Sequence, residues 1–293
     1  MNKIVSCVVL NYNDFDTTVS LISRIKNYDC LNYIVVVDNL STDDSYSNLL
    51  KLESERIIVL SSGKNGGYGF GNNCGLKYAI NELKSDYCIV ANPDVIFDED
   101  ILNPMISFLD NNPDYAVVAP AQSGSKKLAW KKTGVFKDQL FNSLILNKLF
   151  NPRYYPDSYF ENFVCDVYAV KGCFLMFRSQ AVVDFGFYDE EFFLFEEEKI
   201  IAYKLEQIGL KSAVLTYISY IHNHSVSIKK SFRKLGKIKS LVLKSNELYL
   251  KKYMHVGNIR LFFIKIYHLF CILESMIYEL FLIVFSKKEK KNV

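Results

Sequence analysis

Short apolar runs alternate with segments of helical spacing along most of the chain. The runs are rich in β-branched residues, as buried parallel strands are, and lie at residues 4–10, 33–38, 57–60, 87–91 and 115–120. Between them, apolar side chains recur three and four positions apart, at residues 17–26, 45–53, 76–83 and 100–109. Strands that alternate with helices predict an α/β fold, in which a mostly parallel central sheet is flanked by helices.

A second group of elements follows a region without clear periodicity. Residues 123–162 are rich in Lys, Tyr, Phe and Pro, and we expect an irregular loop there that acts as a lid or an acceptor-binding insertion. Beyond it we predict strands at residues 164–170, 173–177 and 211–220 and a helix at 197–209. We assign residues 1–228 to a catalytic domain and 229–293 to a membrane-associated C-terminal helical region.

The C-terminal region contains a long apolar segment. Residues 261–285 are numerous enough to span a bilayer, but each charge at the membrane centre costs about 2.5–3.5 kcal/mol. The polar side chains in the segment include Lys265, His268, Glu274, Ser275 and Glu279. All of these except Glu274 fall on one stripe, so we expect an interfacial helix that lies on the membrane rather than crossing it. Packing against the catalytic domain is the alternative.

The composition allows a large core and indicates no polyanionic partner. Half of the 293 residues are apolar and the formal net charge is only +3, so no nucleic-acid partner is expected. The lysines gather near the C-terminus, where they suit an anionic lipid surface or simple solvation. No Cys-x-x-Cys pair or signal-peptide pattern is present. A reducing cytoplasm, at the inner face of the cell membrane, is the expected location.

Polar residues follow each of the first four predicted strands. In such sheets, ligands bind beyond the carboxyl ends of the strands. These ends carry, in chain order, Asn11 with Asn13, then Asp38, then the segment 65–75, and then Asn92 with Asp94. One such residue is commonly a helix cap or a turn residue, but four consecutive cases predict a shared binding rim.

The segment 65–75 holds five glycines and three asparagines. Glycine permits positive φ and close approach to the backbone, and asparagine offers both a donor and an acceptor. The composition is typical of a turn, and at this rim it also suits a loop that folds around a nucleotide. The segment matches neither the dinucleotide fingerprint nor the P-loop.

Carboxylates and imidazoles at the strand ends are candidate metal ligands. Asp94 ends a proline-fixed turn and suits a hard cation such as Mg²⁺ or Mn²⁺, which would neutralise charge on a departing nucleotide. His222 and His224 close a predicted strand, either as metal ligands or as part of a surface turn.

Three adjacent glutamates, at residues 196–198, begin a predicted helix. Acidic residues suit the positive end of a helix dipole, which explains them structurally. Repulsion between adjacent carboxylates also raises the pKa of one of them, which makes one of the three a candidate general base.

Taken in order, these motifs resemble glycosyltransferase family 2, the inverting transferases of the GT-A fold. The matching segments lie at residues 8–13, 36–43, 65–75, 92–95, 172–178, 188–193 and 222–227. Each is short, but together they cover about residues 4–227 and are highly specific. The chain looks most similar to rhamnosyltransferase-like enzymes that build bacterial cell-surface polysaccharide. The resemblance implies a Rossmann-like sheet, here with a C-terminal helical extension.

The resemblance also implies a role for each candidate residue. Asp38 would bind the nucleobase, and Asp94 would bind Mg²⁺ or Mn²⁺ together with His222 or His224. The nucleotide pocket would be lined by Asn11, Asn13, Asn65, Gly66, Gly67, Asn72, Asn73 and Asn92. Glu198 would be the catalytic base; because the family usually has Asp there, Glu197 stays an alternative.

The implied reaction is direct displacement at the anomeric carbon of a nucleotide-sugar. The implied donor is dTDP-rhamnose or a UDP-hexose, and we expect a lipid-linked saccharide acceptor. A transferase-like domain that binds a nucleotide or glycan without turnover is one alternative, supported by the Glu at the usual Asp position. A nucleotidyltransferase would need a basic, Gly-rich loop near the N-terminus, which residues 4–14 lack.

Overall fold

The computed structural model describes residues 3–150, 153–223 and 235–289. These residues belong to two compact units. The first unit comprises Met1–Lys131, Tyr154–Phe193 and Glu197–His224. The second comprises Lys132–Arg153, Leu194–Glu196 and Ser225–Val293. The second unit therefore contains two segments, Lys132–Arg153 and Leu194–Glu196, that the sequence pattern assigns to the catalytic domain.

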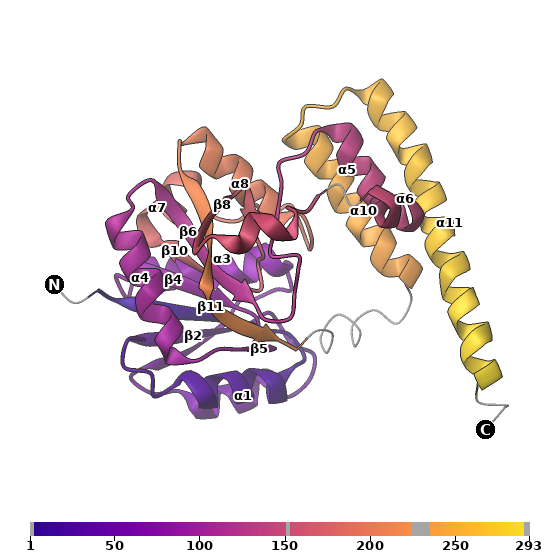
Figure 1. Ribbon diagram of the computed structural model, residues 1–293. Helices are drawn as coiled ribbons and strands as arrows, with labels where there is room; N and C mark the ends of the chain where they lie inside the picture. Colours follow the sequence, from indigo (N-terminus) through magenta and orange to yellow (C-terminus); the bar gives the residue numbers. More distant parts are fainter. Residues whose placement is uncertain (1–2, 151–152, 224–234, 290–293) are drawn as a thin grey trace. The chain divides into compact units, whose positions relative to one another are not determined.

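The first unit is built on a nine-stranded sheet with helices packed against it (Figure 1). Its strands are β1 (Val5–Asn11), β2 (Tyr33–Asp38), β3 (Ile57–Ser61), β4 (Tyr87–Ala91), β5 (Val95–Ile96), β6 (Tyr115–Gln122), β8 (Val164–Val167), β10 (Phe174–Arg178) and β11 (Lys211–His222). The order is β3-β2-β1-β4-β10-β6-β11-β5, with β8 paired to β11. Only β10, β5 and β8 run against their neighbours, so the predicted mostly parallel sheet is confirmed. A separate antiparallel pair joins β7 (Ala129–Trp130) to β9 (Ala169–Val170).

Two hydrophobic clusters cover the two faces of the sheet, because side chains alternate along each strand. Cys7 and Val9 of β1 lie in one cluster, whereas Val8 lies in the other. The first cluster contains residues of α1 (Phe15–Ile25), α2 (Ser45–Leu49) and α4 (Leu102–Asn111), which follow the predicted helices. The second contains residues of α3 (Tyr68–Asn81), α7 (Ser179–Phe185) and α8 (Glu197–Gln207). Short 3₁₀ turns complete the unit at Leu50–Leu52, Glu99–Ile101 and Asp157–Glu161.

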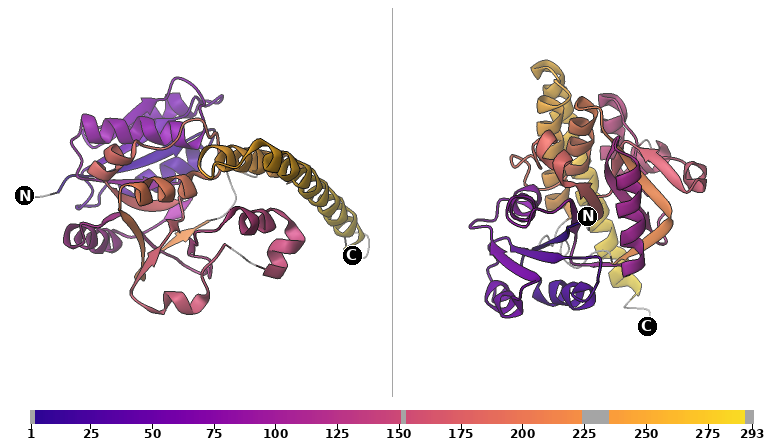
Figure 2. Two further views of the ribbon diagram at one scale, coloured as in Figure 1. Left: turned by 90° about the horizontal axis from the view of Figure 1, so that it is seen from above. Right: turned by 90° about the vertical axis from the view of Figure 1, so that its left-hand side faces the viewer.

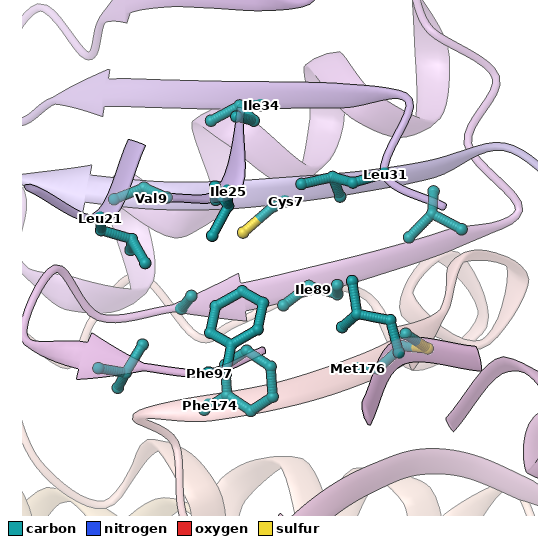
Figure 3. Close-up of a cluster of buried hydrophobic side chains, with 14 of the residues drawn as sticks. Cys7, Val9, Leu21, Ile25, Leu31, Ile34, Ile89, Phe97, Phe174 and Met176 are labelled. Carbon is teal, nitrogen blue, oxygen red and sulfur yellow. The ribbon is translucent and has the colours of Figure 1, made fainter. Parts of the chain in front are cut away.

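Figure 3 shows the first cluster, in which aromatic and aliphatic side chains pack against one another. The ring centroids of Phe97 and Phe174 lie 4.4 Å apart. Both rings are fully buried, together with Ile89 and Ile25. Each such side chain contributes about 1.5–3 kcal/mol by leaving water, so this cluster anchors the strands whose ends carry the candidate site.

The carboxyl ends of β1, β2 and β3 lie in register at one edge. Asn11 pairs with Asp38, and Asp38 pairs with Ser61. The end of β4 lies beside β1, with Ala91 paired to Val9. The parallel register therefore brings these polar strand ends to one rim of the sheet.

The segment 65–75 differs from the expected ligand loop, because α3 begins at Tyr68. Glycine is a poor helix former, but here two glycines let the helix approach the sheet. A Cβ on Gly71 would lie 2.3 Å from Leu10 Cδ1, and one on Gly75 would lie 2.4 Å from Val8 Cγ1. Close helix-to-sheet packing thus accounts for much of the glycine content.

Gly67 is expected to tolerate substitution least among the glycines of this segment. Its φ is +94°, and an added Cβ would lie 2.1 Å from the Phe193 carbonyl oxygen. We expect Gly67→Ala to lower the free energy of unfolding by on the order of 3 kcal/mol, measured by denaturant unfolding. Gly63→Ala is the matched control, since Gly63 has φ +75° but open space around it. Equal losses for the two variants would contradict the clash.

The second unit is helical (Figures 1 and 2). Its helices are α5 (Val135–Asn142), α6 (Leu144–Phe150), α10 (Leu235–Lys252) and α11 (Asn258–Glu289). Together with β7 and the 3₁₀ turn at Asp157–Glu161, α5 and α6 replace the irregular region expected at residues 123–162. The predicted C-terminal helix is confirmed and is longer than expected. Residues Asn258–Leu282 are long and apolar enough to cross a membrane.

Part of the polar stripe of α11 faces protein, because His268 and Ser275 are buried, whereas Lys265 is exposed. Leu261, Ile264, His268, Cys271 and Ser275 are all buried and follow a 3-4-3-4 spacing, which is the seam of a helix pair. His268 contacts Glu247 of α10 at 2.9 Å and Gln139 of α5 at 2.7 Å. Two members of the predicted polar stripe therefore pack within the second unit, and the placement of this helix on a membrane stays a prediction.

Glu274, which lies off that stripe, caps α6. Its carboxylate accepts hydrogen bonds from Ser143 Oγ (3.1 Å) and from the backbone N–H groups of Leu144 (2.8 Å) and Ile145 (3.0 Å). A carboxylate at a helix start satisfies donors that the helix leaves unpaired. This contact explains the charge within the apolar segment.

Candidate active site

A buried hydrogen-bond network joins the ends of β1 and β2. Asn11 Nδ2 donates to Asp38 Oδ1 (2.8 Å) and Ser41 Oγ (3.1 Å). Ser41 donates to Asp38 from its backbone N–H (2.9 Å) and from Oγ (2.6 Å). Asp38 is only 1% exposed. Both of its oxygens thus hold the loop after β2 in shape, and direct contact with a nucleobase stays a prediction.

Asn13 connects the loop after β1 to the same loop. Its backbone N–H donates to Ser41 Oγ (2.9 Å), and its Nδ2 donates to Thr42 Oγ1 (3.0 Å). The Thr42 N–H donates back to Asn13 Oδ1 (2.7 Å). Asn13 has φ +51°, a conformation that asparagine tolerates better than most residues. Partly exposed, Asn13 is better placed than Asn11 to meet a ligand.

The loop before α3 is held by its own amides. Asn39 Nδ2 donates to Asn65 Oδ1 and to the Gly67 carbonyl, both at 3.1 Å. The Gly67 N–H donates to Asn65 Oδ1 at 3.3 Å. The Tyr68 N–H donates to the Phe193 carbonyl at 2.8 Å. Residues 65–67, including Gly66, therefore form a fixed turn at the rim, and their binding of nucleotide stays a prediction.

Asn72 and Asn73 lie inside the fold, each 1% exposed. Asn73 Nδ2 donates to the Tyr188 carbonyl (3.0 Å) and to Glu190 Oε1 (2.8 Å), and its Oδ1 accepts from the Tyr188 N–H (2.9 Å). Asn72 Nδ2 donates to the Tyr68 carbonyl at 3.0 Å. Asn73 therefore anchors the segment around residue 188, which is a structural use of this amide.

Asp94 and His222 meet, although 128 positions separate them in the chain. His222 Nε2 lies 3.1 Å from Asp94 Oδ1, and the Asn223 N–H donates to the Asp94 carbonyl at 3.0 Å. Burial lowers the pKa of His222, but its hydrogen bonds to Asp94 and Cys173 outweigh this effect and raise the pKa to about 9. Antiparallel pairing of β5 with β11 brings the two side chains together. His224 lies outside the described residues.

Tyr68 links the turn after β4 to the start of β10. Its hydroxyl donates to the Gly172 carbonyl (2.8 Å) and lies 3.2 Å from Asn92 Oδ1. The Asn92 N–H donates to the Cys173 carbonyl at 2.8 Å. Asn92 is therefore held beside residues 172–173, and Cys173 in turn contacts His222.

Glu198, in the first turn of α8, contacts Gly172 beside Asn92 and Cys173. Its Oε1 accepts a hydrogen bond from the Gly172 N–H at 3.2 Å. A Cβ on residue 172 would lie 2.9 Å from that oxygen, so a glycine is needed for this approach. Burial raises the pKa of Glu198, although its own N–H, the Gly172 N–H and the charge of Lys171 oppose the shift. A carboxyl group with a raised pKa suits a general base. Glu197 is buried beside it, 7% exposed.

The donor set of Asp94 and His222 fits a divalent cation that shares its ligands with a diphosphate. Mg²⁺ sites commonly use one or two protein carboxylates plus substrate phosphates, rather than a full protein cage. Imidazole also binds first-row metals. No group of three or more metal-binding side chains occurs among the described residues. This pair therefore suits a metal that arrives with its nucleotide.

Three residues that the sequence reasoning did not single out complete the site. Tyr68 and Gly172 are described above, and Lys171 Nζ donates to Gln122 Oε1 at 2.6 Å and to Ser125 Oγ at 3.1 Å. Burial lowers the pKa of Lys171. A Lys-Gly pair directly before a predicted strand is the signal in the sequence that marks this position.

The sequence was also compared with family models and with known proteins, and both comparisons found matches. The family model described as Glycosyl transferase family 2 matches residues 6–181. The low-salt glycan biosynthesis hexosyltransferase Agl10 of Haloferax volcanii is 22% identical over 249 residues, which cover 84% of this chain and 76% of that protein.

Solved structures share the fold. The mannosyltransferase PcManGT from Pyrobaculum calidifontis, in complex with GDP-Man and Mn²⁺, has a TM-score of 0.58 at 12% identity. That match covers 94% of this chain and 73% of the other. S. aureus TarS 1-349, in complex with UDP, has a TM-score of 0.54 at 17% identity and covers 87% and 74%.

Proposed function

Because the chain belongs to glycosyl transferase family 2, we propose that it transfers a hexose from a nucleotide-sugar to a saccharide acceptor with inversion at the anomeric carbon. One observation carries this proposal. The Tyr68 hydroxyl bridges Asn92 and the Gly172 carbonyl, and the Gly172 N–H donates to Glu198, so the turn 92–94 and Glu198 are linked at the carboxyl edge of the sheet. A carboxylate with a raised pKa thus lies near the pair of candidate metal ligands, Asp94 and His222.

In the proposed mechanism, Glu198 accepts the proton of the acceptor hydroxyl as that oxygen attacks. The Gly172 N–H orients the Glu198 carboxylate, and its burial keeps the base neutral until the pH exceeds a raised pKa. Asp94 and His222 would hold the metal. Bound there, the ion would neutralise charge on the departing nucleoside diphosphate. Loops fixed by Asn13, Ser41 and Asn65 would position the nucleotide.

The donor is proposed as a nucleoside-diphosphate hexose. The relative named a hexosyltransferase supports the sugar class, and structural neighbours in complex with GDP-Man or UDP support the nucleotide class. A thermal-shift panel of nucleotide-sugars with Mn²⁺, including dTDP-rhamnose, tests this directly, since a ligand that binds only the folded state raises the melting temperature. Release of nucleoside diphosphate during turnover separates a transferase from a domain that only binds.

We also propose that the second unit places the enzyme on a membrane, near a lipid-linked acceptor. The exposed side of α11 is mostly apolar over residues 259–282, with Ile259, Phe263, Phe270 and Ile277 each at least 64% exposed. Exposed apolar patches of this extent mark interaction surfaces. Since His268, Glu274 and Ser275 of α11 hydrogen-bond within the protein, the exposed apolar face suits lipid. We propose a cytoplasmic location at the inner face of the cell membrane together with this surface.

Charged substitutions on that face are expected to release the protein from vesicles. Phe270→Glu with Ile277→Glu removes two large apolar side chains from lipid, at about 1.5–3 kcal/mol each. Vesicle partitioning of the full chain should therefore fall at least about 100-fold. Flotation with neutral and with anionic phospholipid vesicles measures it.

Val183→Glu is the matched control, because Val183 is 44% exposed on α7 of the other unit. Its partitioning should equal that of the wild type. If the double variant floats with vesicles as well as the control, the lipid surface is assigned wrongly.

A further inference from the structure

The segment before α8 has an unusual backbone. Phe195 and Glu196 both lie in the left-handed region, with φ of +75° and +74°. Bulky residues seldom adopt this conformation, and it persists only where surrounding contacts impose it. The next two residues along the chain are Glu197 and Glu198, which begin α8. Whatever holds this segment therefore also sets where the helix of the proposed base begins.

Two adjacent residues of α10 supply such contacts. Ser245 Oγ donates to the Leu194 carbonyl at 2.6 Å. Asn246 Nδ2 donates to Glu196 Oε1 at 3.1 Å. Together they bind the first and the last residue of the three-residue segment Leu194–Glu196. We call these two contacts the α10 clasp.

Asn246 is itself fixed by a buried polar network. It is fully buried, and its Nδ2 also donates to Asp138 Oδ2 at 2.9 Å. Its Oδ1 accepts from Gln139 Nε2 (3.0 Å) and Asn142 Nδ2 (3.2 Å). Arg153 pairs with Asp138 at 2.8 Å. With both of its amide atoms engaged, the orientation of Asn246 is determined.

The geometry points to Asn246 and Ser245 as positioning residues that hold the segment before α8 and thereby set the conformation of the catalytic glutamate. This inference rests on the proposed role of Glu198 as base. The polar pair on α10 thus has a use beyond holding the helices of the second unit together. Without the clasp, Phe195 and Glu196 would be free to leave the left-handed conformation, which residues of this size seldom adopt unless contacts impose it.

The test compares Asn246→Ala and Ser245→Ala with Asn142→Ala in the full chain. Asn142 belongs to the same buried network but hydrogen-bonds Gln139 and Asn246 rather than the segment Leu194–Glu196, so its variant controls for general loss of packing. Hydrogen–deuterium exchange of residues 190–200 reports the clasp without any need for activity. Steady-state kinetics with a nucleotide-sugar report its effect on the base.

We expect faster exchange at residues 190–200 in both clasp variants than in Asn142→Ala. We also expect kcat to fall about 10- to 100-fold with KM for the nucleotide-sugar unchanged, since a displaced base affects chemistry rather than donor binding. Asn246→Gln, which keeps the amide, should recover part of the rate. Exchange and kcat equal to those of Asn142→Ala would overturn the inference.

Failure of the proposed function gives a different pattern. Wild-type protein that turns over no nucleotide-sugar would remove the role of Glu198, whereas the exchange comparison would still decide whether the clasp holds the segment. If Asn246→Ala does not fold, Ser245→Ala decides both readouts, because it removes one hydroxyl and leaves the buried amide network intact.

Discussion

Glu198→Gln is expected to reduce sugar transfer by about 100- to 10,000-fold, because a general base contributes a factor of this size. The amide keeps the shape of the side chain but cannot accept the acceptor's proton. Initial rates with the best donor of the thermal-shift panel measure the loss. Binding of that donor should be unchanged, which locates the defect in the chemical step.

Two further variants test whether the loss of transfer is specific to the Glu198 carboxylate. Glu197→Gln tests the neighbouring candidate, and Glu206→Gln tests an exposed glutamate on the same helix. Only Glu198→Gln should abolish transfer. A larger loss in Glu197→Gln would move the base by one residue, and near-normal transfer in both would refute the assignment.

The same carboxylate predicts how activity and stability depend on pH. Burial raises the pKa of Glu198, so transfer should fall on the acid side at a pH above the usual glutamate range. Because the folded-state pKa exceeds the unfolded value, the stability that Glu198 contributes is present at low pH and lost as the pH rises through the raised pKa. Glu198→Gln should therefore be at least as stable as wild type at neutral pH, and thermal melts from pH 4 to 8 would show the difference widening.

Asp94→Asn is expected to lower transfer on the order of 100- to 1,000-fold, the range typical of losing one electrostatic contribution to a transition state. The isosteric amide removes the charge that the metal requires. Mn²⁺ should then no longer increase the thermal shift produced by a nucleoside diphosphate. This readout is independent of turnover.

Asp98→Asn is the matched control for that loss, since Asp98 is an exposed carboxylate four residues along. It should behave as wild type in both assays. Unchanged Mn²⁺ dependence in Asp94→Asn would mean that the metal, if used, is held elsewhere.

The strands and the rim were predictable because strong, simple patterns encode them. The strands β2 and β4 lie at the predicted bounds, since each is an uninterrupted apolar run buried on both faces. Parallel register then forces Asn11 beside Asp38. The family resemblance predicted that His222 or His224 lies beside Asp94, and His222 does so, whereas periodicity alone does not place β5 against β11.

Two parts of the chain were misinterpreted for physical reasons. The start of α3 was missed because Gly71 and Gly75 have low helix propensity, which close packing on the sheet offsets. In the second unit the usual pattern of apolar residues inside and polar residues outside is only partly followed. Asp138 and His268 are buried, while Phe136 of α5 and Phe263 of α11 are 71% and 64% exposed. Reasoning that puts polar residues in water therefore misplaces the buried face of these helices.

A crystal structure of the full chain with a nucleoside diphosphate and Mn²⁺ tests the central claim most directly. We expect an anomalous manganese peak within ligand distance of the Asp94 carboxylate and the His222 ring, with the diphosphate completing its shell and Glu198 facing the sugar side of the nucleotide. A manganese peak away from Asp94, or a nucleotide bound outside the rim formed by β1 to β4, would contradict the proposed site.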